Sequence, residues 1–571
     1  MFSDFPKSAK EALGWNWENF SPFYDKLHDT KITEENINQW LTDWNSIQSL
    51  INEIKQIHHV NTLVDTTDEV LKRNYFTFTN LIHLKSETYS LKLSSKLIES
   101  GIQPENFRVP LRIMETDVRI NNAEDQELLI EVNDLIKSYQ LIVNNQTIHH
   151  ESREYSFQEL NQILQNPSRD FRENIWRKMK HRQLQDKEKI NKIWTRIIEL
   201  RTQIARNSGY QNYTEVLSDY IKLDNLSEEM VLDYFKSVRD FVMPVAQRTL
   251  RRRQEKLDLP TLKPWDLDAS KRKMNPLRPF SSIEDLTTKT KKMLSQIDPE
   301  FSVYYQSMID NKMMHLEYSK HKSRLSSFVK FPYSKSPYIF QNALNLDYEM
   351  HQHLHKVSHS IHFYDMKDLP YLQQRDVKIG ISETIAISLN LILSTLLDEE
   401  HGGFYSTKDA LRSIIALYER IVLQWSNSLI IMQFQIWVYR NPELASDPAQ
   451  CDQKWKKLNT EHFTSFDYEG LDAELSLEWQ NIPYMFEYPL FYLELSISIL
   501  VGLQIYENYK KDPKKTIKNL RQGMSLGNTK KLPQLYSSMG IKFTLKGTAV
   551  LRTTANLLQF ILDLEEKIKS M

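Results

Sequence analysis

The sequence predicts an all-α protein with one small β-sheet, and two observations support that prediction. Glycine is scarce, at 12 of 571 residues, and a low glycine content suits long helices with few tight turns. Along most of the chain, apolar residues recur at the three- to four-residue spacing of an amphipathic helix, and strand-like alternation is rare. A chain of this length forms two or three conventional domains or one large helical body.

The expected elements follow from local patterns. Helical periodicity is clearest in four long segments: Gln126–Asn145, Asp170–Asn207, Ser227–Lys256 and Lys408–Tyr439. Three short segments are rich in aromatic and β-branched residues instead: Met313–Tyr318, Ser326–Phe331 and Pro337–Ala343. Turn-prone residues separate these three segments, which predicts the small sheet. We expect a helical N-terminal domain over residues 1–175 and a larger helical domain over residues 176–571.

Charge, hydropathy and cysteine content exclude several classes of protein. The 73 basic and 74 acidic side chains nearly cancel, so no overall field favours nucleic acid or an anionic membrane. The most apolar windows are shorter than the roughly 20 residues that span a bilayer. Cys451 is the only cysteine, which suits a reducing compartment, and the N-terminus has no secretory apolar core. We expect a cytoplasmic protein without nucleic-acid or membrane partners.

The densest group of candidate ligands is a histidine cluster just after the expected sheet. Five of the 16 histidines fall between residues 351 and 362. On a helix this segment has one apolar stripe and, beside it, a histidine stripe: Met350, Leu354, Val357 and Ile361, then His351, His355, His359 and His362. His355 and His359 lie one turn apart, so they can bind one metal ion. A half-buried helix whose histidines bond to neighbouring groups explains the same pattern equally well.

A catalytic zinc site usually needs a third protein ligand. Glu383 is the best candidate, because it follows His359 by 24 residues and opens an apolar helical segment. The alternative is that Glu383 is a first-turn glutamate that complements the helix dipole. Spacing alone leaves both interpretations open.

At this point the chain resembles a known family. The helix His355–His362 has the sequence HKVSHSIH and is similar to the H-E-x-G-H-S-x-H helix of the oligoendopeptidase F and thimet oligopeptidase family. Four other segments resemble elements of that family in the same order: Arg201–Tyr213, Lys263–Leu267, Pro337–Asn345 and Trp479–Tyr492. The first resembles A-x-x-x-G-Y-x-x-Y and the second P-W-D-L. The last resembles W-x-x-I-P-H-F-Y-x-x-P-F-Y, whose P-F-Y end Leu490, Phe491 and Tyr492 follow only loosely. The resemblance covers about residues 170 to 545.

The resemblance implies a zinc metallopeptidase with a mostly helical, clam-shaped fold that cleaves short peptides in a deep channel. It makes residues 176–571 the zinc-metallopeptidase-like catalytic domain. It also identifies His355, His359 and Glu383 as the zinc-ligand positions, and all three are ligand-competent. A nitrogen and oxygen ligand set favours zinc but admits cobalt or manganese.

The catalytic positions depart from the family pattern. Lys356 replaces the general-base glutamate, Ser358 replaces a glycine, and Tyr484 replaces the histidine that helps to stabilise the transition state. A charged lysine cannot accept a proton, and a nearby metal ion repels it. We expect its side chain to turn toward solvent or toward an acidic partner. The phenol of Tyr484 can still donate a hydrogen bond to an oxyanion.

Three hypotheses follow. In the first, the protein keeps the fold and the metal, and it binds short peptides or an extended protein segment without cleaving them. In the second, it is a working zinc oligopeptidase with altered catalytic groups, in which His351 or a carboxylate replaces the missing base. In the third, the metal site has acquired a different reaction, which the additional His351 and His353 permit.

Overall fold

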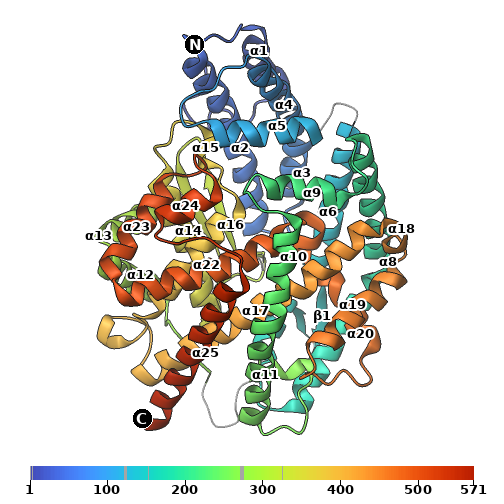
Figure 1. Ribbon diagram of the computed structural model, residues 1–571, viewed down its shortest axis with the longest axis vertical. Helices are drawn as coiled ribbons and strands as arrows, with labels where there is room; N and C mark the ends of the chain where they lie inside the picture. The colour runs from blue at the N-terminus through green and yellow to red at the C-terminus, as the bar shows by residue number, and fades with distance from the viewer. Residues whose placement is uncertain (1, 3, 121–124, 152, 270–275, 324–325) are drawn as a thin grey trace.

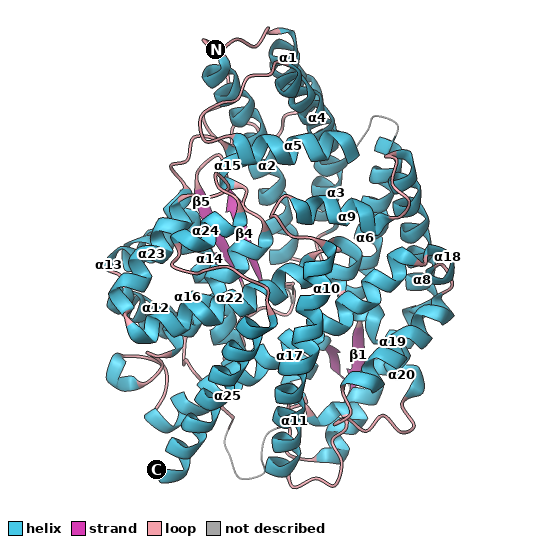
Figure 2. Ribbon diagram, viewed as in Figure 1, coloured by secondary structure: helices cyan, strands magenta, loops and turns pink. Residues whose placement is uncertain are grey.

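The computed structural model describes residues 2, 4–120, 125–151, 153–269, 276–323 and 326–571, and helices dominate it (Figure 2). The predicted all-α fold with small sheets is confirmed. The sheet expected before the histidine helix is present, and the structure adds a second, two-stranded sheet that the sequence did not indicate. Its strands, β1 (Thr147–His150) and β2 (Arg153–Ser156), contain mostly polar residues, so they lack the apolar and β-branched signal of a strand.

The first part of the chain, drawn in blue and cyan in Figure 1, is built mainly of helices. Its helices are α1 (Trp17–Asp29), α2 (Ile37–Val64), α3 (Glu69–Phe78), η1 (Thr79–His83), α4 (Leu84–Glu99), α5 (Arg108–Ile120), α6 (Gln126–Asn144) and α7 (Phe157–Ile163). Helices α1, α2, α4 and α5 share a core that includes Trp40 and Trp44, whose ring centroids are 5.3 Å apart. These helices form the upper end of the molecule in Figure 1.

The middle of the chain contains the longest helix and the three-stranded sheet. Its elements are α8 (Arg169–Asn207), α9 (Tyr213–Lys222), α10 (Glu228–Ser237), η3 (Val238–Val242), α11 (Met243–Leu257), η4 (Pro264–Asp266), α12 (Ile283–Ile297), α13 (Pro299–Asp310), β3 (Met314–His315), β4 (Ser327–Phe331), β5 (Ser336–Phe340), α14 (Asp347–Met366), α15 (Leu372–Arg375) and α16 (Ile379–Ser394). Ser168 caps α8, because its side chain accepts a hydrogen bond from the Phe171 amide.

The last part of the chain packs helices around α16. Its elements are η5 (Glu399–His401), α17 (Thr407–Arg440), α18 (Pro442–Ala445), α19 (Pro448–His462), α20 (Asp472–Leu477), η6 (Glu478–Asn481), α21 (Pro483–Glu487), α22 (Phe491–Lys511), α23 (Pro513–Ser525), α24 (Leu532–Ser538) and α25 (Gly547–Ser570). The chain ends at the lower edge of Figure 1, at the opposite end of the molecule from the N-terminus.

The four predicted long helices are confirmed within a few residues. The segment expected over Ser227–Lys256 is α10 followed by α11, and the five-residue π-helical turn η3 joins the two. The domain boundary expected after residue 175 falls inside α8, which runs from Arg169 to Asn207. The helix is continuous across the expected boundary, and the division into two domains stays a prediction.

The sheet connects the N-terminal helices to the histidine helix. Strand β5 lies in the middle of the sheet. It pairs with β3 in parallel, and it forms an antiparallel hairpin with β4. The hairpin turn contacts α2, where the Glu53 carboxylate accepts hydrogen bonds from the Ser334 amide at 2.7 Å and from its hydroxyl at 3.1 Å. After β5 the chain enters α14, whose start is held by the Glu349 carboxylate, which accepts from the Leu344 amide at 2.7 Å.

Helix α16 is almost completely buried and packs closely against α14 and α22. A Cβ atom at Gly502 of α22 would lie 2.8 Å from Cγ2 of Ile387, so the small residue allows the close approach of the two helices. Only two residues between Gly380 and Ser394 are partly exposed, Ser382 and Glu383. Between Gly380 and Ser394, the solvent-accessible polar groups of this helix therefore lie at one place, near its N-terminal end.

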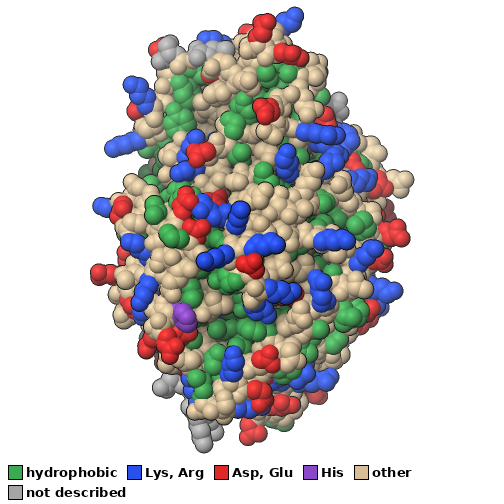
Figure 3. Space-filling model, turned by 60° about the vertical axis from the view of Figure 1, so that its left-hand side comes forward, with side chains coloured by type: hydrophobic (Ala, Val, Ile, Leu, Met, Phe, Trp, Pro, Cys, Tyr) green, Lys and Arg blue, Asp and Glu red, His purple; other side chains and the backbone are tan. Residues whose placement is uncertain are grey.

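The surface has no dominant charge. Basic and acidic side chains are interspersed over the face shown in Figure 3, in agreement with the near-neutral net charge. In the described ranges, no helix is both long and apolar enough to cross a bilayer.

Candidate metal centre

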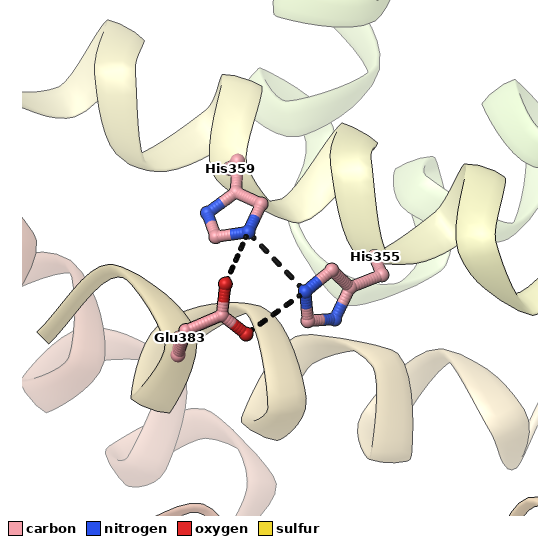
Figure 4. Close-up of side chains that lie close together, drawn as sticks. All are labelled: His355, His359 and Glu383. Carbon is pink, nitrogen blue, oxygen red and sulfur yellow. Dashed lines mark hydrogen bonds and ion pairs between the residues drawn. The ribbon is translucent and has the colours of Figure 1, made fainter. Parts of the chain in front are cut away.

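His355 and His359 on α14 meet Glu383 on α16, and the three side chains point toward one another (Figure 4). The Nε2 atoms of the two histidines are 3.2 Å apart. One carboxylate oxygen of Glu383 lies 3.2 Å from His355 Nε2, and the other lies 3.4 Å from His359 Nε2. The three side chains predicted as ligands therefore converge on one point. The role of Glu383 as a metal ligand stays a prediction.

The spacing of these three atoms fits a tetrahedral metal ion. Zinc binds imidazole nitrogen and carboxylate oxygen at about 2.0 to 2.2 Å, and its sites are usually tetrahedral, so neighbouring ligand atoms lie roughly 3.3 to 3.6 Å apart. The observed separations of 3.2, 3.2 and 3.4 Å are close to this range. Three protein ligands leave the fourth position open for water or substrate, as in catalytic zinc sites.

Neighbouring groups fix the orientation of the His359 ring. Its Nδ1 atom lies 2.8 Å from the hydroxyl oxygen of Ser382, the residue before Glu383. The ring of Phe328 on β4 stacks against it with centroids 5.4 Å apart. A hydrogen bond to one ring nitrogen directs the other toward the metal and sets the tautomer. Ser382 and Phe328 therefore aim Nε2 of His359 at the candidate centre.

The electrostatics also suit a cation. Burial alone would raise the pKa of the Glu383 carboxyl, but the two imidazoles outweigh burial and hold that pKa well below its usual range. Burial lowers the pKa of His359 to about 4, although Glu383 partly opposes the shift. At neutral pH the site therefore presents an ionised carboxylate and a neutral His359 imidazole, the protonation states that metal coordination requires.

Lys356 lies beside this triad, and of the two alternatives expected for its side chain, solvent or an acidic partner, the acidic partner is not found among the described residues. It is half-buried, and no described residue forms an ion pair or hydrogen bond with its ammonium group. Burial lowers the pKa of Lys356 to about 8, while the charge of Glu383 opposes that shift. In the described structure, the position that holds the general base in the family therefore holds an unpaired cation.

The other two altered positions differ in their consequences. Ser358 is fully buried and donates its hydroxyl to the Leu354 carbonyl at 2.8 Å, so it turns away from the triad into its own helix. Tyr484 on α21 is 40% exposed, and its ring stacks on Phe491 with centroids 3.8 Å apart. Partial burial and the charge of Glu383 raise the pKa of Tyr484, so its hydroxyl remains a proton donor near the triad.

The other three histidines between residues 351 and 362 are buried. His351 lies 2.9 Å from the Ser413 hydroxyl, in a network that includes Asp347. His353 lies 2.8 Å from the Tyr305 hydroxyl, and His362 is buried as well. The apolar stripe expected beside them is confirmed, because all four of its residues are at most 1% exposed. His351 is therefore poorly placed to act as a substitute base.

Two residues that position the centre had no sequence signal. Glu494 on α22 accepts a hydrogen bond from the Gly380 amide at 2.7 Å and one from the Tyr488 hydroxyl at 2.8 Å. It thereby anchors the first turn of α16, three residues before Glu383. Ser382, described above, is the second such residue. Neither belongs to a recognisable motif, and both act through contacts between segments that are distant in sequence.

Comparison with known proteins places this chain in a family. Residues 162–553, more than half of the chain, match the family model described as peptidase family M3. No curated protein has a significantly similar sequence. The fold is similar to that of Pz peptidase A solved with an inhibitor, with a TM-score of 0.88 and 18% identity over 99% of each chain.

Two further structures have the same fold. A putative oligoendopeptidase F matches with a TM-score of 0.89 and 17% identity, over 96% of this chain and 97% of that chain. A putative oligoendopeptidase F from Bacillus anthracis str. Ames matches with a TM-score of 0.83 and 18% identity, over 98% and 97%. The clam-shaped, mostly helical fold and the family expected from the sequence are thus confirmed. The chain belongs to peptidase family M3.

Proposed function

We propose that this protein binds short peptides, or an extended segment of a protein partner, at a zinc centre formed by His355, His359 and Glu383. We also propose that its peptide hydrolysis is impaired. The observation that supports impairment most strongly is the unpaired, half-buried ammonium of Lys356 beside a complete ligand triad. The names of the similar structures, a peptidase and two oligoendopeptidases, support peptides as the ligand class.

The proposed impairment concerns proton transfer at Lys356. Zinc, when bound, polarises a carbonyl oxygen and acidifies a coordinated water. Peptide hydrolysis also needs a side chain that takes up a proton and returns it to the leaving amine, and such a group is typically worth about 10² to 10⁴ in rate. With a pKa of about 8, Lys356 is mostly protonated at neutral pH, so only a small fraction of it is able to accept that proton.

Peptide binding does not need the missing base. The hydroxyl of Tyr484 keeps its proton at neutral pH and can donate to a bound carbonyl oxygen. Strand β4 lies at one edge of the sheet beside α14, and an edge strand can pair with an extended peptide. These two features support binding in the absence of efficient cleavage.

A working zinc oligopeptidase is the second candidate function. The complete ligand triad and the proton on Tyr484 favour it. The two candidates differ in whether another group replaces the base.

The test combines three measurements on one preparation of the full-length protein: bound metal, binding of labelled short peptides, and cleavage of a mixed fluorogenic peptide library. We expect about one zinc per chain, saturable peptide binding and very slow cleavage. His359→Ala, which removes one ligand, should lose the metal. Fast cleavage that a chelator abolishes would establish the second candidate instead, and a protein with neither metal nor peptide binding would contradict both.

A further inference from the structure

The charges of the candidate metal centre do not balance when an ion is bound. Among the described residues, Glu383 is the one acidic side chain within ion-pair distance of His355 and His359, and none lies that close to Lys356. A zinc ion and the Lys356 ammonium together bring about three positive charges, which one carboxylate offsets only in part. A ligand that brings negative charge to this point is therefore favoured over a neutral one.

The Lys356 side chain is electrostatically part of this centre. It lies one turn of α14 from His359. Burial lowers the pKa of His359, and the positive charge of Lys356 adds to that shift. Burial also lowers the pKa of Lys356, and the charge of Glu383 opposes the shift. Such mutual effects weaken with distance, so the ammonium lies near both proposed ligands. A half-buried ammonium without a described partner is costly, and an anion beside it removes that cost.

The centre is accessible to a ligand from solvent. The side chain of His355 is 24% exposed and that of Glu383 is 17% exposed. Tyr484, the proton donor near the triad, is also partly exposed. A ligand that reaches the open metal position therefore meets an ammonium group and a phenol hydroxyl, both of which donate hydrogen bonds.

We propose that the peptides bound at this centre present a free C-terminal carboxylate to it, which lies between the metal position and the Lys356 ammonium. This inference rests on the proposed function, which assigns peptides to the centre. A peptide bond is neutral, whereas a terminal carboxylate brings one negative charge and two oxygen atoms that serve two positive groups. The glutamate that Lys356 replaces would repel this carboxylate. The peptide is therefore held by its end, as the carboxylate product of hydrolysis is.

The test uses the full-length, zinc-loaded protein and the fluorescence anisotropy of three N-terminally labelled pentapeptides. These are pentaalanine with a free C-terminus, its C-terminal amide, and the same amide with glutamate as the middle residue. We expect the wild type to bind the free acid at least about tenfold more tightly than either amide. Lys356→Gln should weaken binding of the free acid about tenfold or more and leave the alanine amide unchanged, whereas Lys356→Arg, which keeps the charge, should retain the preference.

Lys367→Gln is the matched control. Lys367 is half-buried like Lys356 and follows the last turn of the same helix, but its ammonium lies over the rings of Tyr304 and Tyr364. This variant removes the same charge at a distance from the centre, so it should bind all three peptides as the wild type does.

The outcomes separate this proposal from the proposed function. Equal affinity for the free acid and the alanine amide, or the same preference in the wild type and Lys356→Gln, would overturn the proposal and leave peptide binding intact. Binding of the glutamate amide as tightly as the free acid would assign the position to side-chain carboxylates and would also overturn it. Binding of none of the peptides would contradict both this proposal and the proposed function.

Discussion

Ser382 shows how one hydroxyl can determine the geometry of the candidate metal centre. Its oxygen lies 2.8 Å from His359 Nδ1, so the ring keeps Nε2 directed at Glu383 and His355. Groups that orient a metal ligand in this way are typically worth roughly 10- to 100-fold in metal affinity. We therefore expect the Ser382 hydroxyl to affect metal affinity although it is not one of the proposed ligands.

We predict that Ser382→Ala weakens zinc affinity about tenfold or more, because His359 loses the partner that fixes its tautomer and orientation. Competition with a chromophoric chelator measures the affinity. Ser388→Ala is the matched control on the same helix, since the Ser388 hydroxyl bonds only within α16, to the Thr384 carbonyl. Equal affinity in the wild type and Ser382→Ala would show that the hydroxyl has no orienting role.

The residue scale is also where sequence reasoning succeeded and failed most clearly. The proximity of His355, His359 and Glu383 follows a prediction from a motif with helical spacing and a family resemblance. Their role as metal ligands stays a prediction. Ser382 and Glu494 were missed because each acts through a contact with a distant segment, His359 in one case and Gly380 in the other. Lys356 was expected to turn toward solvent or toward an acidic partner, and no described residue forms an ion pair with it.

At the scale of elements, the contact between α16 and α22 sets the position of Glu383. The two helices approach closely because Gly502 has no side chain, and Ile387 of α16 occupies the space that a Cβ atom would need. Glu494 adds a polar anchor at the other end of the same contact. The metal centre therefore depends on helix packing as well as on its ligands.

We predict that Gly502→Ala destabilises the protein by about 1 to 3 kcal/mol, because the added methyl group overpacks a tight contact. Denaturant unfolding of the metal-free protein measures the change. The matched control is Gly14→Ala, where a Cβ atom would have no neighbour within 4 Å. A stability loss that is the same for both variants would contradict this account of the α16–α22 contact.

The residue types in each helix and strand explain which of them the sequence predicted. Long helices such as α8 and α17 have strong apolar periodicity, so their bounds were predicted within a few residues. The strands β3, β4 and β5 were predicted from aromatic and β-branched residues. Strands β1 and β2 were not, because TIHH and REYS are mostly polar and pair only with each other.

At the scale of the whole molecule, buried histidines link stability to pH. Burial lowers the pKa of His351 to about 4, and that of His83 to about 3. In the unfolded chain both imidazoles have a pKa near the ordinary value of about 6.5. The folded-state pKa is the lower one, so these groups stabilise the protein fully above about pH 6.5, and this stabilisation is lost as the pH falls below that value.

We therefore predict that the free energy of unfolding of the metal-free protein decreases between pH 6.5 and pH 4.5. Each such histidine contributes up to about 1.4 kcal/mol per pH unit. His351→Gln should flatten this dependence, whereas the surface variant His401→Gln should not, since His401 is exposed. Urea unfolding at several pH values measures it, and stability that is constant over this range would contradict the prediction.

The arrangement of the whole molecule was the least accessible to sequence reasoning. Single contacts across large sequence separations join α2 and the chain just after it to the region of the sheet. Glu53 of α2 bonds to Ser334 of the hairpin turn, and Thr66 bonds to the His321 carbonyl in the loop before β4. No local sequence pattern predicts such pairs. The fold class, in contrast, follows from patterns repeated along the chain, and the family resemblance supplied the clam-shaped architecture.

The central claim is that an intact ligand triad lacks its proton acceptor because of Lys356, and one measurement tests it directly. The kcat/KM for a fluorogenic peptide is compared between zinc-loaded wild type and Lys356→Glu, with Lys356→Gln as the control that removes the charge without supplying a base. We predict a gain of about 10² or more for Lys356→Glu and a much smaller gain for Lys356→Gln. A wild type that cleaves as fast as Lys356→Glu would contradict the claim.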